Sequence, residues 1–153
     1  MQPVLTLEEF EAFEKQVLIT AVRQLAATCH NNAVEAGWWY NDLSMTDLKM
    51  CINGKEEHFD RLFAGALIGQ KLCLIHSEIS EAMEGARKNL MDDKLKHRTM
   101  LEVELADAII RIFDLGGALR LDIVGAIIEK LEFNKTRPDH KPENRAKEGG
   151  KSF

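Results

Sequence analysis

Apolar residues recur at spacings of three and four along most of this chain, and this period limits the possible folds more than any other feature. The first run includes Leu7, Phe10 and Phe13 and predicts a helix over about residues 7–35, ending near Gly37. No segment alternates convincingly between apolar and polar residues, which leaves little room for a sheet. The pattern therefore predicts an all-α fold, most simply a bundle of four or five helices.

Three more helices are expected, each with its own start or stop signal. One covers about residues 58–89, where Gly65 and Gly69 allow a break. Another follows the Thr99–Glu102 capping box and runs to about residue 119, and the last begins after Asp122 and ends near residue 135, before Pro138. Between the first two helices, Ser44 and Asp47 are spaced to cap a short helix that stops at Asn53-Gly54.

Length and charge limit the domain count and the partners. With 153 residues, 45% of them hydrophobic and 29% charged, we expect one globular domain over residues 1–153, with its core at about 6–137. Residues 138–153 form a basic tail that we expect to be disordered in the free protein. The net charge of −5 argues against a nucleic-acid partner.

Cysteine number and apolar run length bear on the cellular compartment. Cys29, Cys51 and Cys73 are odd in number and form no CxxC pair, so we expect free, buried thiols rather than a disulfide framework or a zinc finger. The N-terminal residues carry acidic side chains where a signal peptide needs basic ones, and the longest uncharged apolar run, residues 62–70, is too short to span a membrane. These features predict a soluble, cytoplasmic protein with no membrane partner.

The helix expected over residues 100–119 is apolar except for one narrow stripe. Beyond Glu102, its polar side chains are Glu104, Asp107, Arg111 and Asp114, at spacings of three and four. A surface helix has a broad polar face, so we expect this helix to be mostly buried with a thin charged line. Arg111 is able to neutralise one neighbouring carboxylate but not all three.

The preceding helix has a second acidic pair, Glu78 and Glu81, on one face. If the two helices pack antiparallel, Glu78, Glu81, Glu104 and Asp107 come together, and four carboxylates select a hard cation such as Mg²⁺ or Mn²⁺. The alternative is a solvated acidic face, which is the usual role of either pair alone. A di-iron site would require Glu-x-x-His on two helices, which this chain lacks, so His76 is assigned a structural role.

The last helix carries the opposite charge. Lys130, Asn134 and Arg137 share one face, with Lys135 beside them, and this set suits a polyphosphate. The alternative is that these cations only complement the dipole at the end of the helix. Trp38 and Trp39 are either core anchors or a platform for a base.

Four segments together resemble the MazG-like all-α nucleoside triphosphate pyrophosphohydrolases, especially the short, phage-type, single-domain members. They are IHSEISEAMEGARK (75–88), ELADAIIRIFDL (104–115), EKLEFNKTRP (129–138) and NNAVEAGWW (31–39). The resemblance implies Mg²⁺-dependent cleavage of a (deoxy)nucleoside triphosphate between the α and β phosphates, releasing the monophosphate and pyrophosphate. It also implies a homodimer or homotetramer.

The same resemblance assigns roles to residues. The metal ligands and catalytic residues would be Glu78, Glu81, Glu104 and Asp107. The phosphate-binding residues would be Lys130, Asn134 and Arg137, with Lys135 nearby. Trp38 or Trp39 would line a base pocket. Ser77 stands where the family motif has its first glutamate, and residues 41–62 look like an insertion. Two other functions remain open: an all-α dUTPase of related chemistry, and a non-catalytic helical binding module.

Overall fold

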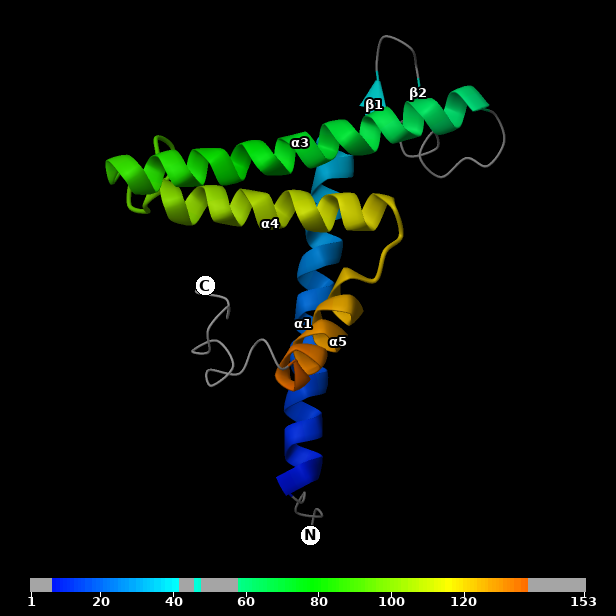
Figure 1. Cartoon of the computed structure of the whole chain (residues 1–153), viewed down its shortest axis with the longest axis vertical. Helices are drawn as coiled ribbons and strands as arrows, with labels where there is room; N and C mark the ends of the chain where they lie inside the picture. Colours follow the sequence, from blue (N-terminus) through cyan, green and yellow to red (C-terminus); the bar gives the residue numbers. More distant parts are fainter. Residues whose placement is uncertain (1–6, 42–45, 48–57, 138–153) are drawn as a thin grey trace, which may run out of the picture. The chain divides into compact units, whose positions relative to one another are not determined.

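The computed structural model describes residues 7–41, 46–47 and 58–137 and is all-α. Its four helices are α1 (Leu7–Glu35), α3 (His58–Lys88), α4 (Met100–Ala118) and α5 (Ile123–Thr136) (Figure 1). Two strands of two residues each, β1 (Tyr40–Asn41) and β2 (Thr46–Asp47), form a small antiparallel ladder. The sequence did not predict this ladder. The pairing of Thr46 and Asp47 with β1 replaces part of the short helix expected there, and Ser44 and the Asn53-Gly54 stop lie outside the described residues.

The helix boundaries follow from local capping. Thr99 and Glu102 form the expected capping box, with the Glu102 N–H donating to Thr99 Oγ1 at 3.2 Å and the Thr99 N–H donating to Glu102 Oε2 at 3.2 Å. Asp122 Oδ1 accepts a hydrogen bond from the Gly125 N–H at 2.9 Å and so begins α5. After α1, Gly37 has a φ of +81°, a conformation that glycine adopts without strain. Helix α3 continues through Gly65 and Gly69, so the break considered there does not occur.

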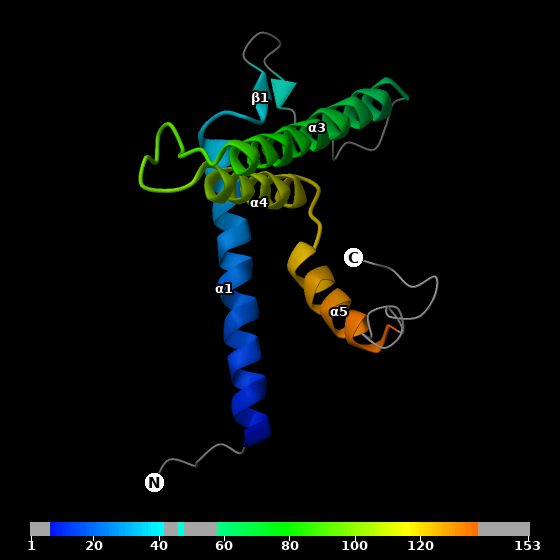
Figure 2. The same ribbon diagram turned by 60° about the vertical axis from the view of Figure 1, so that its left-hand side comes forward.

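The chain divides into two compact units, Met1–Leu121 and Asp122–Phe153. In the first unit, α3 and α4 pack side by side, and both Figure 1 and Figure 2 show this pair. The contacts run antiparallel, because Gly85 near the end of α3 lies against Met100 at the start of α4, while Glu78 meets Arg111. In the second unit the structure describes α5 and Arg137, and the tail 138–153 lies outside the described residues.

The core of the first unit is small. Trp39, Leu115 and Ala118 are buried together, with Ala33, Ile75 and Leu119 partly buried around them. Of the two cysteines described, Cys29 is buried as expected, but Cys73 is exposed, so the prediction of buried thiols is wrong for Cys73. Cys73 lies on a part of α3 that neither α1 nor α4 covers enough to bury it.

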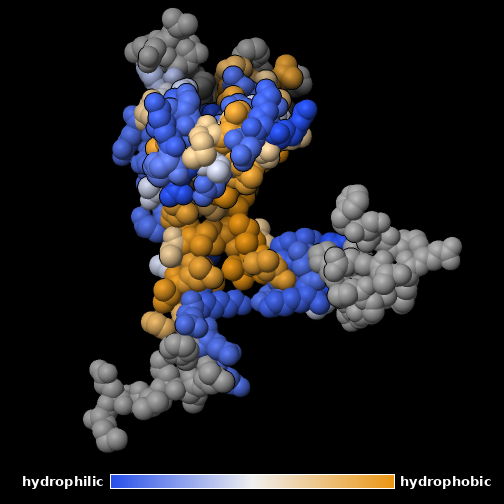
Figure 3. Space-filling view, turned by 90° about the vertical axis from the view of Figure 1, so that its left-hand side faces the viewer, coloured by the Kyte–Doolittle hydropathy of each residue, from blue (hydrophilic) through white to orange (hydrophobic). Residues whose placement is uncertain are grey.

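Helix α4 is oriented opposite to expectation. Its charged stripe faces the neighbouring helices: Glu104 and Asp114 are buried beside small or C-terminal apolar residues such as Ala108 and Leu115, while Leu105, Ile109 and Ile112 are exposed. The prediction of a mostly buried α4 is therefore wrong for this chain by itself. Figure 3 shows apolar residues as a broad orange area on one face of the molecule.

One stretch of α3, Leu62–Lys88, is long and apolar enough to cross a membrane by length and composition alone. The longest uncharged apolar run, residues 62–70, is too short for a span, but Leu62–Lys88 contains 18 consecutive residues of high mean hydropathy with at most two charged side chains. This is weak support for a span, since core helices of soluble proteins pass the same test. Glu78 of this helix packs against α4, which gives one face of the stretch a protein partner.

Candidate metal centre

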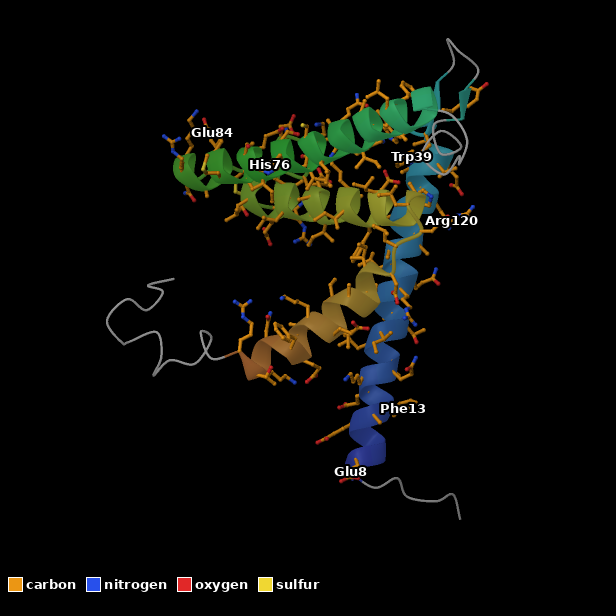
Figure 4. The ribbon with its side chains drawn as sticks, turned by 45° about the vertical axis from the view of Figure 1, so that its right-hand side comes forward. Glu8, Phe13, Trp39, His76, Glu84 and Arg120 are labelled. Atoms are coloured by element: carbon orange, nitrogen blue, oxygen red, sulfur yellow. The ribbon has the colours of Figure 1, made fainter. Side chains whose placement is uncertain are left out.

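Three of the four predicted carboxylates meet where α3 packs on α4. Glu78, Glu104 and Asp107 each offer one oxygen, and these oxygens lie within 4.8 Å of one another. Glu78 and Glu104 are buried, at 6% and 9% exposed, and Asp107 is the most accessible of the three. The side chains of both helices are drawn in Figure 4.

Local features of the sequence bring these carboxylates together. Glu104 and Asp107 are three residues apart and so point to the same side of α4. The capping box fixes the first turn of α4, and Gly85 allows that turn to lie close against α3. A Cβ atom on Gly85 would lie 2.9 Å from Met100 Cβ, which shows how near the two backbones come.

The crowding of negative charge shows in the protonation of the cluster. Burial, a hydrogen bond with Glu78, and the charges of Glu81, Glu78 and Asp107 raise the pKa of Glu104 to about 7. The pKa of Asp107 is also raised, mainly by burial and then by the charge of Glu78, and the nearby Arg111 opposes this shift. The cluster therefore holds more negative charge than its surroundings neutralise.

One cation already contacts the cluster. Arg111 Nε donates a hydrogen bond to Glu78 Oε1 at 2.6 Å, and the Glu78 side chain is buried in this ion pair. The sequence predicts that Arg111 pairs with Asp107 or Asp114 on its own helix. The structure instead pairs it with a carboxylate of α3.

The fourth predicted ligand, Glu81, is exposed and lies outside the group of three. Its charge still contributes to the raised pKa of Glu104, so it is near the cluster. Asp92, which was not predicted from the sequence, is buried in the connector between α3 and α4, and its charge adds to the raised pKa of Asp107. Asp92 Oδ1 accepts hydrogen bonds from the backbone N–H groups of Lys94, at 3.0 Å, and Leu95. This turn signature within Asp-Asp-Lys-Leu could have indicated its position.

The donor set fits a hard divalent cation. All three groups are carboxylates, and Mg²⁺ and Mn²⁺ prefer oxygen ligands. A bound dication would favour the charged form of Glu104, whose proton is retained up to a pH of about 7 in the cluster alone. Glu78, Glu104 and Asp107 are therefore the residues that would hold the metal, with Glu81 next to them.

A second polar group lies further along α4 and was not predicted. Asp114 Oδ1 accepts a hydrogen bond from the Trp39 indole at 2.7 Å and lies 2.8 Å from His30 Nδ1. His30 packs close to Gly117, where a Cβ atom would lie 2.5 Å from the His30 ring. This network fixes the C-terminal part of α1 and the segment after it on α4.

The two tryptophans have different environments. Trp39 is 2% exposed and belongs to the core, near the junction of α1 with the α3–α4 pair, as Figure 4 shows. Trp38 is 70% exposed, and so it is the tryptophan with a ring accessible to a ligand. His76, labelled on α3 in Figure 4, is exposed and forms no part of the three-carboxylate group.

The predicted phosphate-binding residues belong to the second unit. Lys130 and Asn134 lie in α5, and Arg137 follows as its C-terminal cap. Lys130 Nζ lies 4.8 Å from the centre of the Phe133 ring. Lys135 is paired with Glu132, with Nζ 3.0 Å from both carboxylate oxygens, so part of its charge is already neutralised.

Comparison with known proteins adds no relative. No family model, no curated protein and no solved structure matches this chain. The resemblance to the MazG-like enzymes therefore rests on the four sequence segments alone.

Proposed function

We propose that this protein is a Mg²⁺-dependent nucleoside triphosphate pyrophosphohydrolase of the MazG-like type. It would cleave a (deoxy)nucleoside triphosphate between the α and β phosphates, and Mn²⁺ would be able to replace Mg²⁺. The observation that carries the proposal is the meeting of Glu78, Glu104 and Asp107 within 4.8 Å, from two helices that contain the segments 75–88 and 104–115 behind the resemblance. The raised pKa of Glu104 is a second sign of a site suited to a cation.

Each part of the chain has a role in the proposal. Glu78, Glu104 and Asp107 would hold the metal, which when bound would polarise the α-phosphoryl group and lower the pKa of a water. Glu81 is close to this group and accessible, so it is suited to orient the attacking water. On α5, Lys130, Asn134 and Arg137 would bind phosphates, with Lys135 contributing less because Glu132 pairs with it. Trp38, rather than the buried Trp39, has the exposure needed to contact a base.

Two further parts of the proposal concern assembly and location. The many exposed apolar side chains of α3 and α4 support a homodimer or homotetramer, because a stable surface rarely carries so much apolar area without a partner. The proposal includes a cytoplasmic location without a membrane partner, and the net charge of −5 argues against a nucleic-acid partner. The base and sugar of the substrate are not assigned, so a dUTPase of the same chemistry falls within the proposal.

A second candidate is a non-catalytic helical binding module. The Arg111–Glu78 ion pair favours it, because this contact neutralises one carboxylate of the cluster without any metal. The two candidates differ in their response to Mg²⁺. An enzyme is expected to be stabilised by the cation and to turn over nucleotides, while a module held by ion pairs is not.

Product analysis tests the proposed function. Purified protein is incubated with Mg²⁺ and each common dNTP and NTP, and the products are separated by ion-exchange chromatography. Monophosphate with pyrophosphate supports the proposal. Diphosphate with phosphate would show that another bond is cut, and no turnover with Mg²⁺ or Mn²⁺ would contradict the proposal in favour of the binding module.

Substitution of a ligand makes the test specific. Asp107→Asn is expected to lower kcat by at least about a hundredfold, since even residues that only support metal ligands cost about 10- to 100-fold when changed. Helical content, measured by circular dichroism, is expected to remain. Asp93→Asn, at an exposed position in the connector, is the matched control. An Asp107→Asn variant within a few-fold of wild type would contradict the ligand assignment.

A further inference from the structure

Arg111 has binding capacity that its ion pair does not use. Its Nε donates to Glu78, but a guanidinium has five N–H donors, and no other partner for it is present in the described part of the chain. The Arg111 side chain is 43% exposed, so solvent or a ligand is able to reach it. Arg111 is therefore held beside the carboxylate cluster through its Nε, and its side chain remains partly accessible.

Lys71 is a second cation in the same helix pair, and it belongs to none of the sequence motifs described above. It precedes Glu78 by two helical turns and so lies on the same face of α3. Its Nζ lies 4.1 Å from the centre of the Trp39 ring and 3.5 Å from the Trp38 carbonyl oxygen, and it forms no ion pair among the described residues. Its half-buried ammonium therefore contacts an aromatic ring and one distant carbonyl oxygen, but no carboxylate.

Contacts around Trp39 show that Lys71 and Arg111 are neighbours. Trp39 lies under Lys71 and donates a hydrogen bond to Asp114, and Asp114 is one turn beyond Arg111 on α4. Lys71 and Arg111 thus lie near each other along the contact of α3 with α4, and Arg111 is the one beside the three carboxylates. Burial is the main cause that lowers the pKa of Lys71; the charge of Asp114 opposes this shift, and that of Arg111 adds to it.

The charges along this line change from negative to positive, apart from Asp114, which accepts a hydrogen bond from Trp39. Three carboxylates lie at one end, followed by Arg111 and then Lys71. A polyphosphate that shares its oxygens with a divalent cation needs positive groups beside that cation, and both arginine and lysine bind phosphate well. Two neighbouring cations with few anionic partners meet this need.

We infer that Lys71 and Arg111 form a polyphosphate subsite on α3 and α4, beside the carboxylate cluster and distinct from the basic residues of α5. The inference deepens the proposed function, on which it rests, by naming two further substrate-binding residues. In a purely structural role, Lys71 would only pack on Trp39 and Arg111 would only neutralise Glu78. Binding of an anion distinguishes the two roles.

Inorganic tripolyphosphate is the probe, titrated into the full chain with saturating Mg²⁺ and followed by isothermal titration calorimetry. Lys71→Met keeps the apolar stem over Trp39 but removes the charge, and Arg111→Gln keeps a polar side chain. Each is expected to weaken the affinity about tenfold or more, because each removes a charge-assisted contact. Lys71→Arg is expected to restore most of the affinity. Lys88→Met is the matched control, because Lys88 lies on the same helix and is paired with Glu84.

Several results overturn the inference. The inference is wrong if the wild-type protein does not bind tripolyphosphate. It is also wrong if the Lys71→Met and Arg111→Gln variants fold and bind tripolyphosphate with the affinity of the wild type. If Lys71→Met does not fold, the other two variants still test the inference. It requires that Arg111→Gln binds tripolyphosphate more weakly and that Lys71→Arg binds it about as well as the wild type.

Kinetics separate this inference from the proposed function. If nucleotides are hydrolysed, both charge-removing variants are expected to raise KM much more than they lower kcat. Hydrolysis with an unchanged KM in both variants would overturn the subsite and leave the proposed function intact. Binding of tripolyphosphate that depends on Lys71, without turnover of any nucleotide, would support the subsite and contradict the proposed function.

Discussion

Glu104 holds its proton more tightly than an ordinary glutamate because burial and three nearby carboxylates disfavour its charge. Its pKa of about 7 in the folded chain lies above the ordinary value of 4.5, so between these values the folded state binds more protons than the unfolded state. The metal-free protein should therefore lose stability as the pH rises from about 4.5 to about 7. We expect the Glu104→Gln variant to lose less stability over this pH range, because the glutamine amide does not ionise.

Thermal unfolding in the presence of a chelator, at several pH values from 5 to 8, measures this difference. Glu129→Gln, at an exposed position of α5, is the matched control and should follow the wild type. Addition of Mg²⁺ at pH 8 should raise the Tm of the wild type and not that of Glu104→Gln. Parallel pH profiles for wild type and Glu104→Gln would show that the carboxylates do not crowd Glu104 as described.

The spacing of residues was enough to select Glu78, Glu104 and Asp107, because helical period decides which side chains share a face. It was not enough to find the partners of these residues. His30 and Asp114 are 84 positions apart, and their contact depends on where α1 meets α4. Likewise, Arg111 has acidic neighbours on its own helix, and only the packing of α3 on α4 places Glu78 nearer.

Gly85 determines how closely α3 and α4 pack. In an open helix interior, alanine is about 1 kcal/mol more favourable than glycine. At Gly85, however, a Cβ would lie 2.9 Å from Met100 Cβ and Cγ, and such overpacking costs about 1–3 kcal/mol. We expect Gly85→Ala to lower the free energy of unfolding and, by separating the helices, to weaken Mg²⁺ binding; urea denaturation and calorimetry measure these two effects.

Gly69→Ala is the matched control on the same helix, since nothing lies within 4 Å of a Cβ at Gly69. It should raise the free energy of unfolding by up to about 1 kcal/mol. If both substitutions stabilised the protein equally, the close approach of α3 and α4 at Gly85 would be contradicted.

Among the secondary-structure elements, capping residues correctly predicted where helices begin. The Thr99–Glu102 box and Asp122 each begin a helix in the structure, because these side chains satisfy N–H groups that the helix itself leaves unpaired. The glycines at 65 and 69 gave a misleading signal, since a long helix tolerates them at modest cost. The β1–β2 ladder was missed because strands of two residues carry no detectable alternation.

The first unit leaves much apolar area uncovered for a chain that is 45% hydrophobic. On α4, Leu101, Leu105, Ile109 and Ile112 form one exposed stripe at helical spacing. On α3, Leu72, Ile79 and Met83 form another. Apolar stripes of this kind are typical of helices that pack against further helices, and no helix described in the first unit covers these.

A second copy of the chain is the partner that the proposed function names, so light scattering after size-exclusion chromatography should give a mass that is a multiple of 17.3 kDa. Ile109→Glu, in the middle of the α4 stripe, should shift the assembly toward the single chain, because a charge would be buried in the interface. Leu95→Glu places the same charge at an exposed apolar position of the connector and should leave the mass unchanged.

Two results would contradict this assembly, and they have different meanings. A folded single chain at micromolar concentration would mean that the stripes are stable in water, or that the missing partner is another protein. Flotation of the purified protein with lipid vesicles would instead assign the apolar surface of α3 to a membrane, which the Leu62–Lys88 stretch is long enough to span. In that case the charge of Glu78 would have to remain paired with Arg111, because an unpaired carboxylate is costly in lipid. Arg111→Gln would then abolish flotation, whereas in a water-soluble oligomer it would leave the mass unchanged.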